Sequence, residues 1–162
     1  VGRLAGLTLT FVGDGNNVAR SLAVVCGLLG MRFVLAAPKA YQFDEAFRQH
    51  LKSILPEAEM EETTDPVAAV TGAAVVYTDV WTSMGQEKER LKRLTDLKPY
   101  QVNEALMKHC PDALFMHCLP ARRGEEVTDG VIDGPQSVVV EEAANRMHVQ
   151  KGLLAWLLGP QK

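Results

Sequence analysis

The chain has 162 residues, of which 47% are hydrophobic and 23% are charged, so it can bury a substantial core and suits a single soluble domain. The formal net charge of −3 argues against a nucleic-acid-binding protein, whose surface would be basic. No apolar run approaches the roughly 20 residues that a helix needs to cross a bilayer. We therefore expect neither nucleic acid nor a membrane as a partner.

The three cysteines, Cys26, Cys110 and Cys118, form an odd set without the spacing of metal ligands. Reduced thiols of this kind are typical of the cytoplasm, which is the predicted location. Cys26 lies in an apolar stretch and is expected to be a small buried hydrophobic residue. The sequence suggests no metal site and no organic cofactor.

Strand and helix patterns alternate along the first half of the chain. The predicted strands are residues 7–12, residues 32–37 and, more weakly, residues 58–62, and the predicted helices are residues 18–30 and 44–54. Asn16 or Asn17 is suited to cap the first helix, because its side-chain oxygen can accept free N–H groups of the first turn.

The same alternation continues to the end of the chain, with a short helix after the Asp65-Pro66 start signal. The further predicted strands are residues 73–78, 113–118 and 137–140, and the further predicted helices are residues 86–94, 102–109 and 141–158. Strands that alternate with helices predict one α/β domain over residues 1–162. Its sheet should be doubly wound, mostly parallel and Rossmann-like, with helices on both faces.

Two predicted strands end in residues that carry chemistry. The apolar run 113–116 leads into His117-Cys118-Leu119-Pro120, and residues 73–78 lead into Asp79. Open α/β sheets bind ligands beyond the carboxyl ends of their strands, so we expect Asp79 and Cys118 to border one cleft. Asp79 would hold a substrate ammonium group through a charge-assisted hydrogen bond. A turn or a helix cap is the alternative role for this carboxylate.

The turns near these strand ends offer further polar groups. Ser83, Met84 and Gly85 provide a hydroxyl, a flexible thioether and a residue free to adopt unusual backbone angles. Asn17 would contribute an amide that both donates and accepts hydrogen bonds to a small polar ligand. For both segments, a turn without a ligand is the alternative.

The thiol of Cys118 invites comparison with a nucleophilic Cys–His pair. Adjacent strand residues point to opposite faces, so His117 should not activate Cys118 directly. We predict instead a thiol that positions or desolvates a substrate amine, with a packed strand end as the alternative. Arg146, near the start of the last helix, could bind an anion through paired hydrogen bonds, although helical surface arginines are more often structural.

The first turn, residues 13–19, superficially resembles a dinucleotide-binding fingerprint. The acidic residue expected about 20 positions later is missing, and residues 36–38 are Ala-Ala-Pro. Asn16 and Asn17 also present amides where a pyrophosphate would require bare backbone. Two alternatives remain open: a nucleotide-binding Rossmann domain of an oxidoreductase, and a non-catalytic module that senses an amino acid.

Four motifs, taken together, resemble the ornithine carbamoyltransferases. They are Gly13-Asp14-Gly15-Asn16-Asn17, the run from Asp79 to Gln86 with its Ser-Met-Gly, His117-Cys118-Leu119-Pro120, and Glu141-Glu142-Ala143-Ala144-Asn145-Arg146-Met147-His148. The resemblance covers essentially the whole chain and implies an ornithine-binding domain. It implies that ornithine binds Asn17, Asp79, Ser83 and Met84, that Cys118 and Leu119 lie beside the reacting amine and the carbamoyl group, and that Arg146 contacts carbamoyl phosphate.

The implied reaction transfers the carbamoyl group from carbamoyl phosphate to the δ-amine of L-ornithine, giving L-citrulline and phosphate without a cofactor. Asp79 and Cys118 would be the catalytic residues. The family's N-terminal domain, which holds most of the carbamoyl phosphate site, has no counterpart in the sequence. We therefore expect a homotrimer only for the complete enzyme, and little or no activity for this chain alone. Leu153, Trp156 and Leu157 of the last helix are expected either to pack partly on the sheet or to promote self-association.

Overall fold

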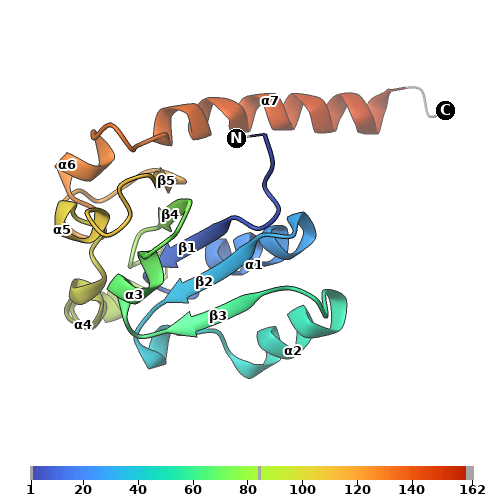
Figure 1. Ribbon diagram of the computed structural model, residues 1–162. Coiled ribbons are helices and arrows are strands. Elements are labelled where there is room, and N and C mark those ends of the chain that lie inside the picture. The colour runs from blue at the N-terminus through green and yellow to red at the C-terminus, as the bar shows by residue number, and fades with distance from the viewer. Residues whose placement is uncertain (1, 84, 160–162) are drawn as a thin grey trace.

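The computed structural model describes residues 2–83 and 85–159, and a single parallel sheet forms its centre (Figure 1). The strands are β1 (Thr8–Val12), β2 (Arg32–Ala36), β3 (Met60–Thr63), β4 (Val75–Thr78) and β5 (Leu114–His117). Their order across the sheet is β3-β2-β1-β4-β5, and every neighbouring pair is parallel. The predicted parallel α/β fold is confirmed.

Helices connect successive strands. The α-helices are α1 (Asn17–Leu29), α2 (Glu45–Ile54), α3 (Pro66–Val70), α4 (Arg90–Leu97), α5 (Glu104–Met107), α6 (Asp129–Ile132) and α7 (Val139–Leu158), and the 3₁₀ helices are η1 (Lys39–Tyr41), η2 (Glu87–Glu89) and η3 (Lys98–Tyr100). The chain builds the sheet outward from β1 to β3, then crosses back to place β4 on the other side of β1. This reversal marks the edge at which doubly wound sheets bind ligands.

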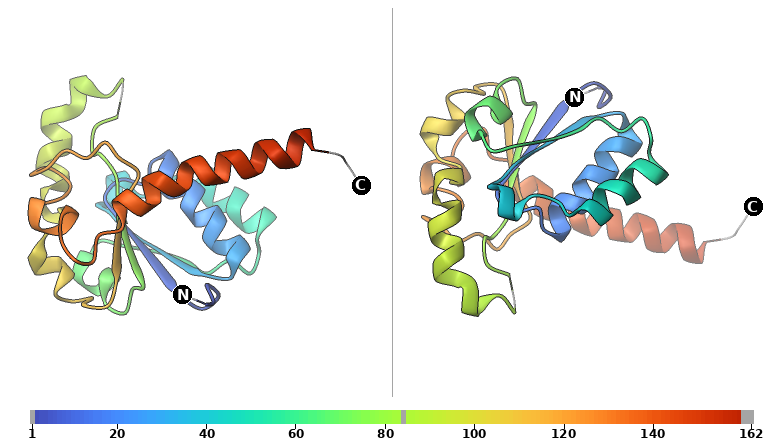
Figure 2. Two further views of the ribbon diagram at one scale, coloured as in Figure 1. Left: turned by 90° about the horizontal axis from the view of Figure 1, so that it is seen from above. Right: turned by 90° about the horizontal axis from the view of Figure 1, so that it is seen from below.

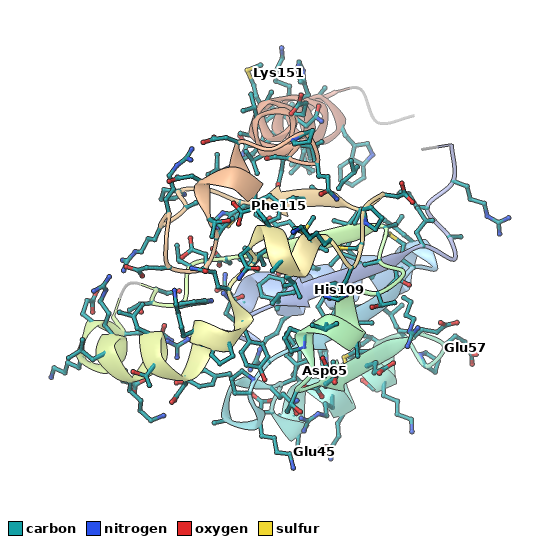
Figure 3. The ribbon with its side chains drawn as sticks, turned by 60° about the vertical axis from the view of Figure 1, so that its left-hand side comes forward. Glu45, Glu57, Asp65, His109, Phe115 and Lys151 are labelled. Carbon is teal, nitrogen blue, oxygen red and sulfur yellow. The ribbon has the colours of Figure 1, made fainter. Side chains whose placement is uncertain are left out.

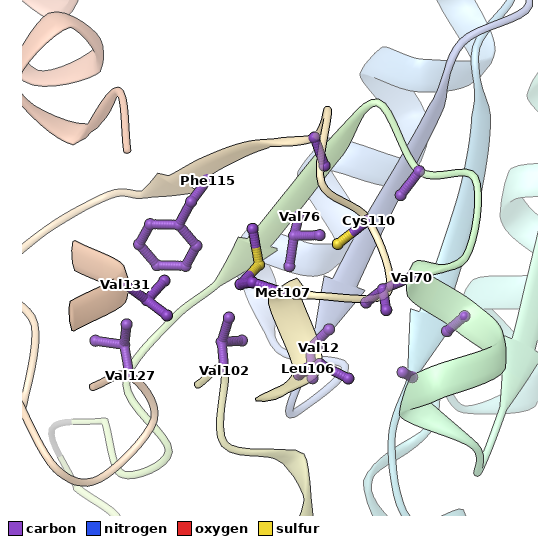
Figure 4. Packing of buried hydrophobic residues seen from close by; sticks show 14 of the residues in the cluster. Val12, Val70, Val76, Val102, Leu106, Met107, Cys110, Phe115, Val127 and Val131 are labelled. Atoms are coloured by element: carbon purple, nitrogen blue, oxygen red, sulfur yellow. The ribbon is translucent and has the colours of Figure 1, made fainter. Parts of the chain in front are cut away.

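The sheet separates two apolar clusters, because successive strand residues point to opposite faces. On β1, Leu9 and Phe11 belong to one cluster, whereas Val12 belongs to the other. Figure 4 shows the second cluster, in which Phe115 of β5 and Met107 of α5 lie together. Both faces of the sheet are therefore covered, as the sequence predicts.

The first helix begins and ends as its sequence indicates. Asn16 is the N-cap of α1, and its side chain accepts from the backbone N–H groups of Val18 and Ala19. Gly30 closes the helix in the left-handed region, with a φ of 66°. Cys26 is 1% exposed, which confirms its prediction as a buried residue.

The predicted strand at residues 137–140 is wrong. Ser137 makes only an isolated bridge to Phe115, and α7 begins at Val139. The β-branched residues favour a strand locally, but Glu141 and Glu142 lie in the first turn of α7, where negative charge stabilises a helix N-terminus. The segment therefore turns helical after a single bridge.

Two predicted helices have different bounds in the structure. The helix predicted over residues 102–109 shrinks to α5, because Val102 forms a parallel bridge with Val127. The helix predicted over residues 86–94 starts as the short η2 and continues as α4 to Leu97. Pairing with a distant segment sets the start of the first helix, and a 3₁₀ turn sets the start of the second. Local periodicity shows neither feature.

The last helix extends away from the body of the molecule (Figures 1 and 2). Leu153, Trp156 and Leu157 are 52%, 70% and 54% exposed, so the expectation that they pack on the sheet is wrong. The sheet ends below the first turns of α7, and the rest of the helix has no sheet beneath it. Among the described residues, no helix is both long and apolar enough to cross a membrane.

Candidate active site

Asp79 and Cys118 meet at the carboxyl ends of neighbouring strands. Thr78 of β4 pairs with His117 of β5, so the next residue of each strand reaches the same point of the sheet edge. The Cys118 thiol donates to Asp79 Oδ1 at 3.2 Å. Asp79 is 8% exposed, so the carboxylate lies largely out of water. The expectation that these two strand ends share one site is confirmed.

A third side chain, from the turn after β1, completes this cluster. Asn16 Nδ2 donates to Asp79 Oδ2 at 2.9 Å, while Asn16 Oδ1 caps α1. The cap fixes the amide orientation and thereby directs its N–H toward Asp79. We predicted Asn17 as the ligand-binding amide, but Asn17 is exposed, and the asparagine that contacts Asp79 is Asn16. The preference of asparagine for N-caps applies to Asn16 and Asn17 alike, and the structure shows that Asn16 is the cap.

The Cys118 thiol is held in its protonated form. Burial, followed by the nearby carboxylates of Asp79 and Glu142, raises the pKa of Cys118 to about 12. A thiol with such a pKa is a poor nucleophile near neutral pH, because the thiolate is the reactive species. This agrees with a thiol that positions a substrate rather than one that attacks it.

His117 has partners of its own, away from the thiol. Its Nε2 lies 3.2 Å from Glu126 Oε1, and both side chains are fully buried. Its Nδ1 accepts the backbone N–H of Leu119 at 2.9 Å. Leu119 adopts a φ of 54°, in the left-handed region that bulky residues rarely occupy. The buried imidazole therefore shapes the backbone immediately after Cys118.

One potential metal-ligand group exists among the described residues, formed by Asp79, His117 and Cys118, whose ligand atoms lie within 4.8 Å of one another. Both ring nitrogens of His117 already face a partner, and the ring is fully buried. The Cys118 thiol is protonated near neutral pH, whereas metals bind the thiolate. The donors are therefore arranged as a hydrogen-bonded cluster rather than as a preformed metal site.

Two cavities flank the cluster and hold most of the other predicted site residues. A polar cavity of about 570 Å³ is lined in part by Asn17, Ser83 and Arg93. A second cavity, of about 540 Å³, is lined in part by Cys118 and Arg146. Arg146 thus lines the same cavity as Cys118, and its contact with carbamoyl phosphate stays a prediction. Met84, another predicted ligand-binding residue, lies outside the described residues.

The loop after Asp79 is tied to the body by Arg93 of α4. This buried guanidinium donates to the backbone oxygen of Trp81 and forms an ion pair with Asp14 in the first turn. Burial raises the pKa of Asp14, and the nearby Arg93 opposes that rise. The backbone oxygen of Ser83 accepts from the Gln86 backbone N–H, and the Ser83 backbone N–H donates to Gln86 Oε1. No local sequence pattern predicts this tie.

The fold and this cluster define a parallel α/β domain with a hydrogen-bonded polar group at the ligand edge of its sheet, and known proteins match this domain. The family model for the Asp/Orn binding domain of aspartate/ornithine carbamoyltransferases matches residues 5–157. The chain therefore belongs to this family. The match favours the resemblance noted above over a nucleotide-binding or an amino-acid-sensing module.

Similar proteins are ornithine carbamoyltransferases. The chain is 51% identical over 164 residues to that of Pyrococcus abyssi and 49% identical over 160 residues to that of Nostoc punctiforme, covering 99% and 98% of this chain but 52% of each relative. The solved structure of ornithine carbamoyltransferase from Pyrococcus furiosus matches 99% of this chain and 52% of its own, with a TM-score of 0.91 and 49% identity. The chain spans about half the length of these relatives.

Proposed function

We propose that the chain is the ornithine-binding half of an ornithine carbamoyltransferase. The observation that carries this proposal is the contact between Asp79 and Cys118, braced by Asn16, at the ligand edge of a domain that belongs to this family. Ornithine would bind between the strand ends and the polar cavity that contains Asn17 and Ser83. Met84 would join them from the same loop.

The charge of the cluster favours ornithine over aspartate, the other amino acid in the family name. Asp79 offers a largely buried carboxylate, which attracts an ammonium group through a charge-assisted hydrogen bond. The side-chain carboxylate of aspartate would instead be repelled by Asp79 and by nearby Asp14. The charge of the site therefore favours an amino acid with a cationic side chain.

In the proposed reaction, the neutral δ-amine of ornithine attacks the carbamoyl carbon. The new N–C bond forms, the C–O bond to phosphate breaks, and the amine releases a proton. Asp79 would attract and orient ornithine's ammonium group, which loses one proton to become the neutral amine before it attacks and a second proton once the N–C bond has formed. The uncharged Cys118 thiol and Leu119 would hold the amine against the carbamoyl group. Arg146 would contact carbamoyl phosphate, whose negative charge suits a guanidinium.

The rest of the site would come from a second half, which in the relatives accounts for the length not matched here. We propose that this half supplies most of the carbamoyl phosphate site, and that the complete enzyme is a cytoplasmic homotrimer. Neither carbamoyl transfer nor citrulline release is expected from this chain alone.

The test is a titration of this chain with L-ornithine, followed by backbone amide NMR shifts. L-Lysine, longer by one methylene, is the control for chain length, and L-aspartate is the control for charge. We expect selective ornithine shifts at Asn17, Asp79 and Ser83, and their loss in Asp79→Asn. Equal shifts with all three amino acids, or shifts unchanged by Asp79→Asn, would contradict the proposal.

A further inference from the structure

Glu142, in the first turn of α7, binds the ends of both strands that carry the Asp79–Cys118 pair. Its Oε1 accepts from the Tyr77 hydroxyl of β4 at 2.6 Å. Its Oε2 accepts from the backbone N–H of His117 of β5 at 3.0 Å. One carboxylate therefore joins three separate elements.

The two partners of Glu142 lie next to the reacting groups. Tyr77 precedes Asp79 by two residues, and His117 directly precedes Cys118. Tyr77 is 4% exposed and His117 is fully buried, so water does not compete strongly for these hydrogen bonds. Hydrogen bonds to a charged acceptor are stronger than neutral ones. The Glu142 side chain thus ties both strand ends to the first turn of α7.

Glu142 also acts on Cys118 through its charge. The two carboxylates facing the thiol are Asp79 from β4 and Glu142 from α7, and both disfavour the thiolate. Figure 3 looks almost along α7, with Phe115 of β5 beneath the helix and Lys151 on the side turned away from the sheet. Beyond its first turns the helix is exposed, and Glu142 is the α7 residue that hydrogen-bonds to both strand ends.

We propose that Glu142 is a positioning residue, which makes the geometry of the Asp79–Cys118 pair depend on how α7 is seated. The consequence for ornithine binding rests on the proposed function, whereas the coupling of Glu142 to Cys118 does not.

The test compares Glu142→Ala and Glu142→Gln with the matched variants Glu141→Ala and Glu141→Gln. Glu141 lies in the same helical turn with the same charge, but it is exposed. Two readouts are measured on the whole chain: amide hydrogen exchange at His117, and the Cβ chemical shift of Cys118 as a function of pH. A role confined to stability would lower the unfolding temperature without moving the thiol titration.

We expect Glu142→Ala to speed exchange at His117 by about tenfold or more. Glu142→Gln should lower the titration midpoint of Cys118 because one of the two facing charges is removed. The Glu141 variants should change neither readout. If Glu142→Ala does not fold, Tyr77→Phe, which removes one of the two partners, replaces it in the exchange measurement. Native values of both readouts in the Glu142 variants would overturn the proposal.

Ornithine binding separates this inference from the proposed function. If the native chain binds ornithine, Glu142→Ala should bind it at least about fivefold more weakly, a coupling of the size that contacts within one network show, while Glu141→Ala binds normally. Unchanged affinity in Glu142→Ala would count against the positioning role. If the native chain binds no ornithine, the proposed function fails, and the exchange and thiol readouts still decide the role of Glu142.

Discussion

At Asp79, one carboxylate accepts hydrogen bonds from the side-chain amide of Asn16, from the backbone N–H of Val80 and from the Cys118 thiol. Such a carboxylate is pre-oriented, because each oxygen is already held before a substrate arrives. It also controls the thiol, since its charge helps to keep Cys118 protonated. The first prediction concerns this pair.

Cys118 should react very slowly with iodoacetamide. Its pKa of about 12, against 9.0 for an ordinary thiol, leaves a thiolate fraction near neutral pH that is smaller by a factor of about a thousand. Asp79→Asn removes one cause of the raised pKa, so it should speed the reaction. Mass spectrometry of the alkylated peptides measures both rates and separates Cys118 from Cys26 and Cys110.

The same pKa sets the sign of a stability effect. The pKa of Cys118 is higher in the folded than in the unfolded protein. The contribution of the thiol to the free energy of unfolding is therefore complete below about pH 9 and is lost as the pH rises toward 12. Cys118→Ser should therefore flatten the fall in stability over this alkaline range. A Cys118 alkylation rate equal to that of an unfolded peptide would refute both statements.

Leu119 holds a backbone conformation that glycine adopts more readily. Its φ is 54°, and its side chain is partly exposed, so little apolar burial is at stake. Leu119→Gly should be more stable than Leu119→Ala by about 0.5–1 kcal/mol, since the left-handed region strains any residue with a Cβ. Urea unfolding measures the difference.

A control with the opposite sign is available on α4. Leu91 is exposed and helical, so Leu91→Ala should exceed Leu91→Gly in stability by about 1 kcal/mol. If the alanine variant were more stable than the glycine variant at both positions, the left-handed backbone at Leu119 would not be strained.

Among the elements, α1 illustrates how a helix cap serves the site. Asn16→Ala should lower the free energy of unfolding by about 2 kcal/mol, because it removes the cap and the side-chain amide that donates to Asp79 Oδ2. Asn103→Ala, which removes an ordinary cap from α5, should have about half this effect. Urea unfolding compares the two variants.

Asn16→Asp separates the two roles of this residue. The variant keeps a capping oxygen but places a second carboxylate against Asp79, which raises the pKa of the pair. Its destabilisation should therefore be large near neutral pH and shrink as the pH falls and one carboxylate takes up a proton. If Asn16→Asp were equally destabilising at neutral and at acidic pH, Asn16 would act only as a helix cap.

The tie between α4 and the loop after Asp79 depends on Arg93. Arg93→Met should lower the free energy of unfolding by about 3 kcal/mol, because it leaves Asp14 buried without its ion-pair partner. Without Arg93 the pKa of Asp14 should rise further, so the loss should grow as the pH increases through that pKa. Urea unfolding at acidic and neutral pH measures this trend.

Lys92 supplies the matched control one residue away. It pairs with Asp96 at the surface, where the lysine side chain is 70% exposed, so Lys92→Met should change stability by less than about 1 kcal/mol. If Lys92→Met and Arg93→Met lowered the free energy of unfolding by similar amounts, the Arg93–Asp14 ion pair would contribute no more to stability than an exposed pair.

For the whole molecule, local sequence signals predicted the sheet, the order of its elements and the meeting of Asp79 with Cys118. These features follow from side-chain periodicity and from the rule that parallel strands present their carboxyl ends at one edge. The contact of Asn16 with Asp79 and the ties made by Arg93 and Glu142 were not predicted. Each joins residues far apart in the chain, and no local pattern encodes such a distance.

The exposed part of α7 decides the behaviour of the chain in solution. Its exposed apolar residues are Val140, Met147, Val149, Leu153, Leu154, Trp156, Leu157 and Leu158. Many exposed apolar side chains on a projecting helix favour association, because burial removes them from water. We therefore expect the chain to self-associate at micromolar concentration, and Leu153→Lys/Leu157→Lys to be largely monomeric. Sedimentation velocity measures the change.

If the proposed function holds, the same surface should bind the half of an ornithine carbamoyltransferase that this chain does not match. Adding the missing half of the Pyrococcus furiosus relative should dissociate the self-associated chain and produce citrulline formation that neither half has alone. The doubly substituted α7 variant should need more of the added half for the same rate, whereas Leu91→Lys, an equivalent charge on the exposed face of α4, should behave as the native chain does. If the native chain is monomeric and the α7 variant complements normally, α7 is not the docking surface. Unaided citrulline formation by the purified chain would instead show that this half carries a complete site.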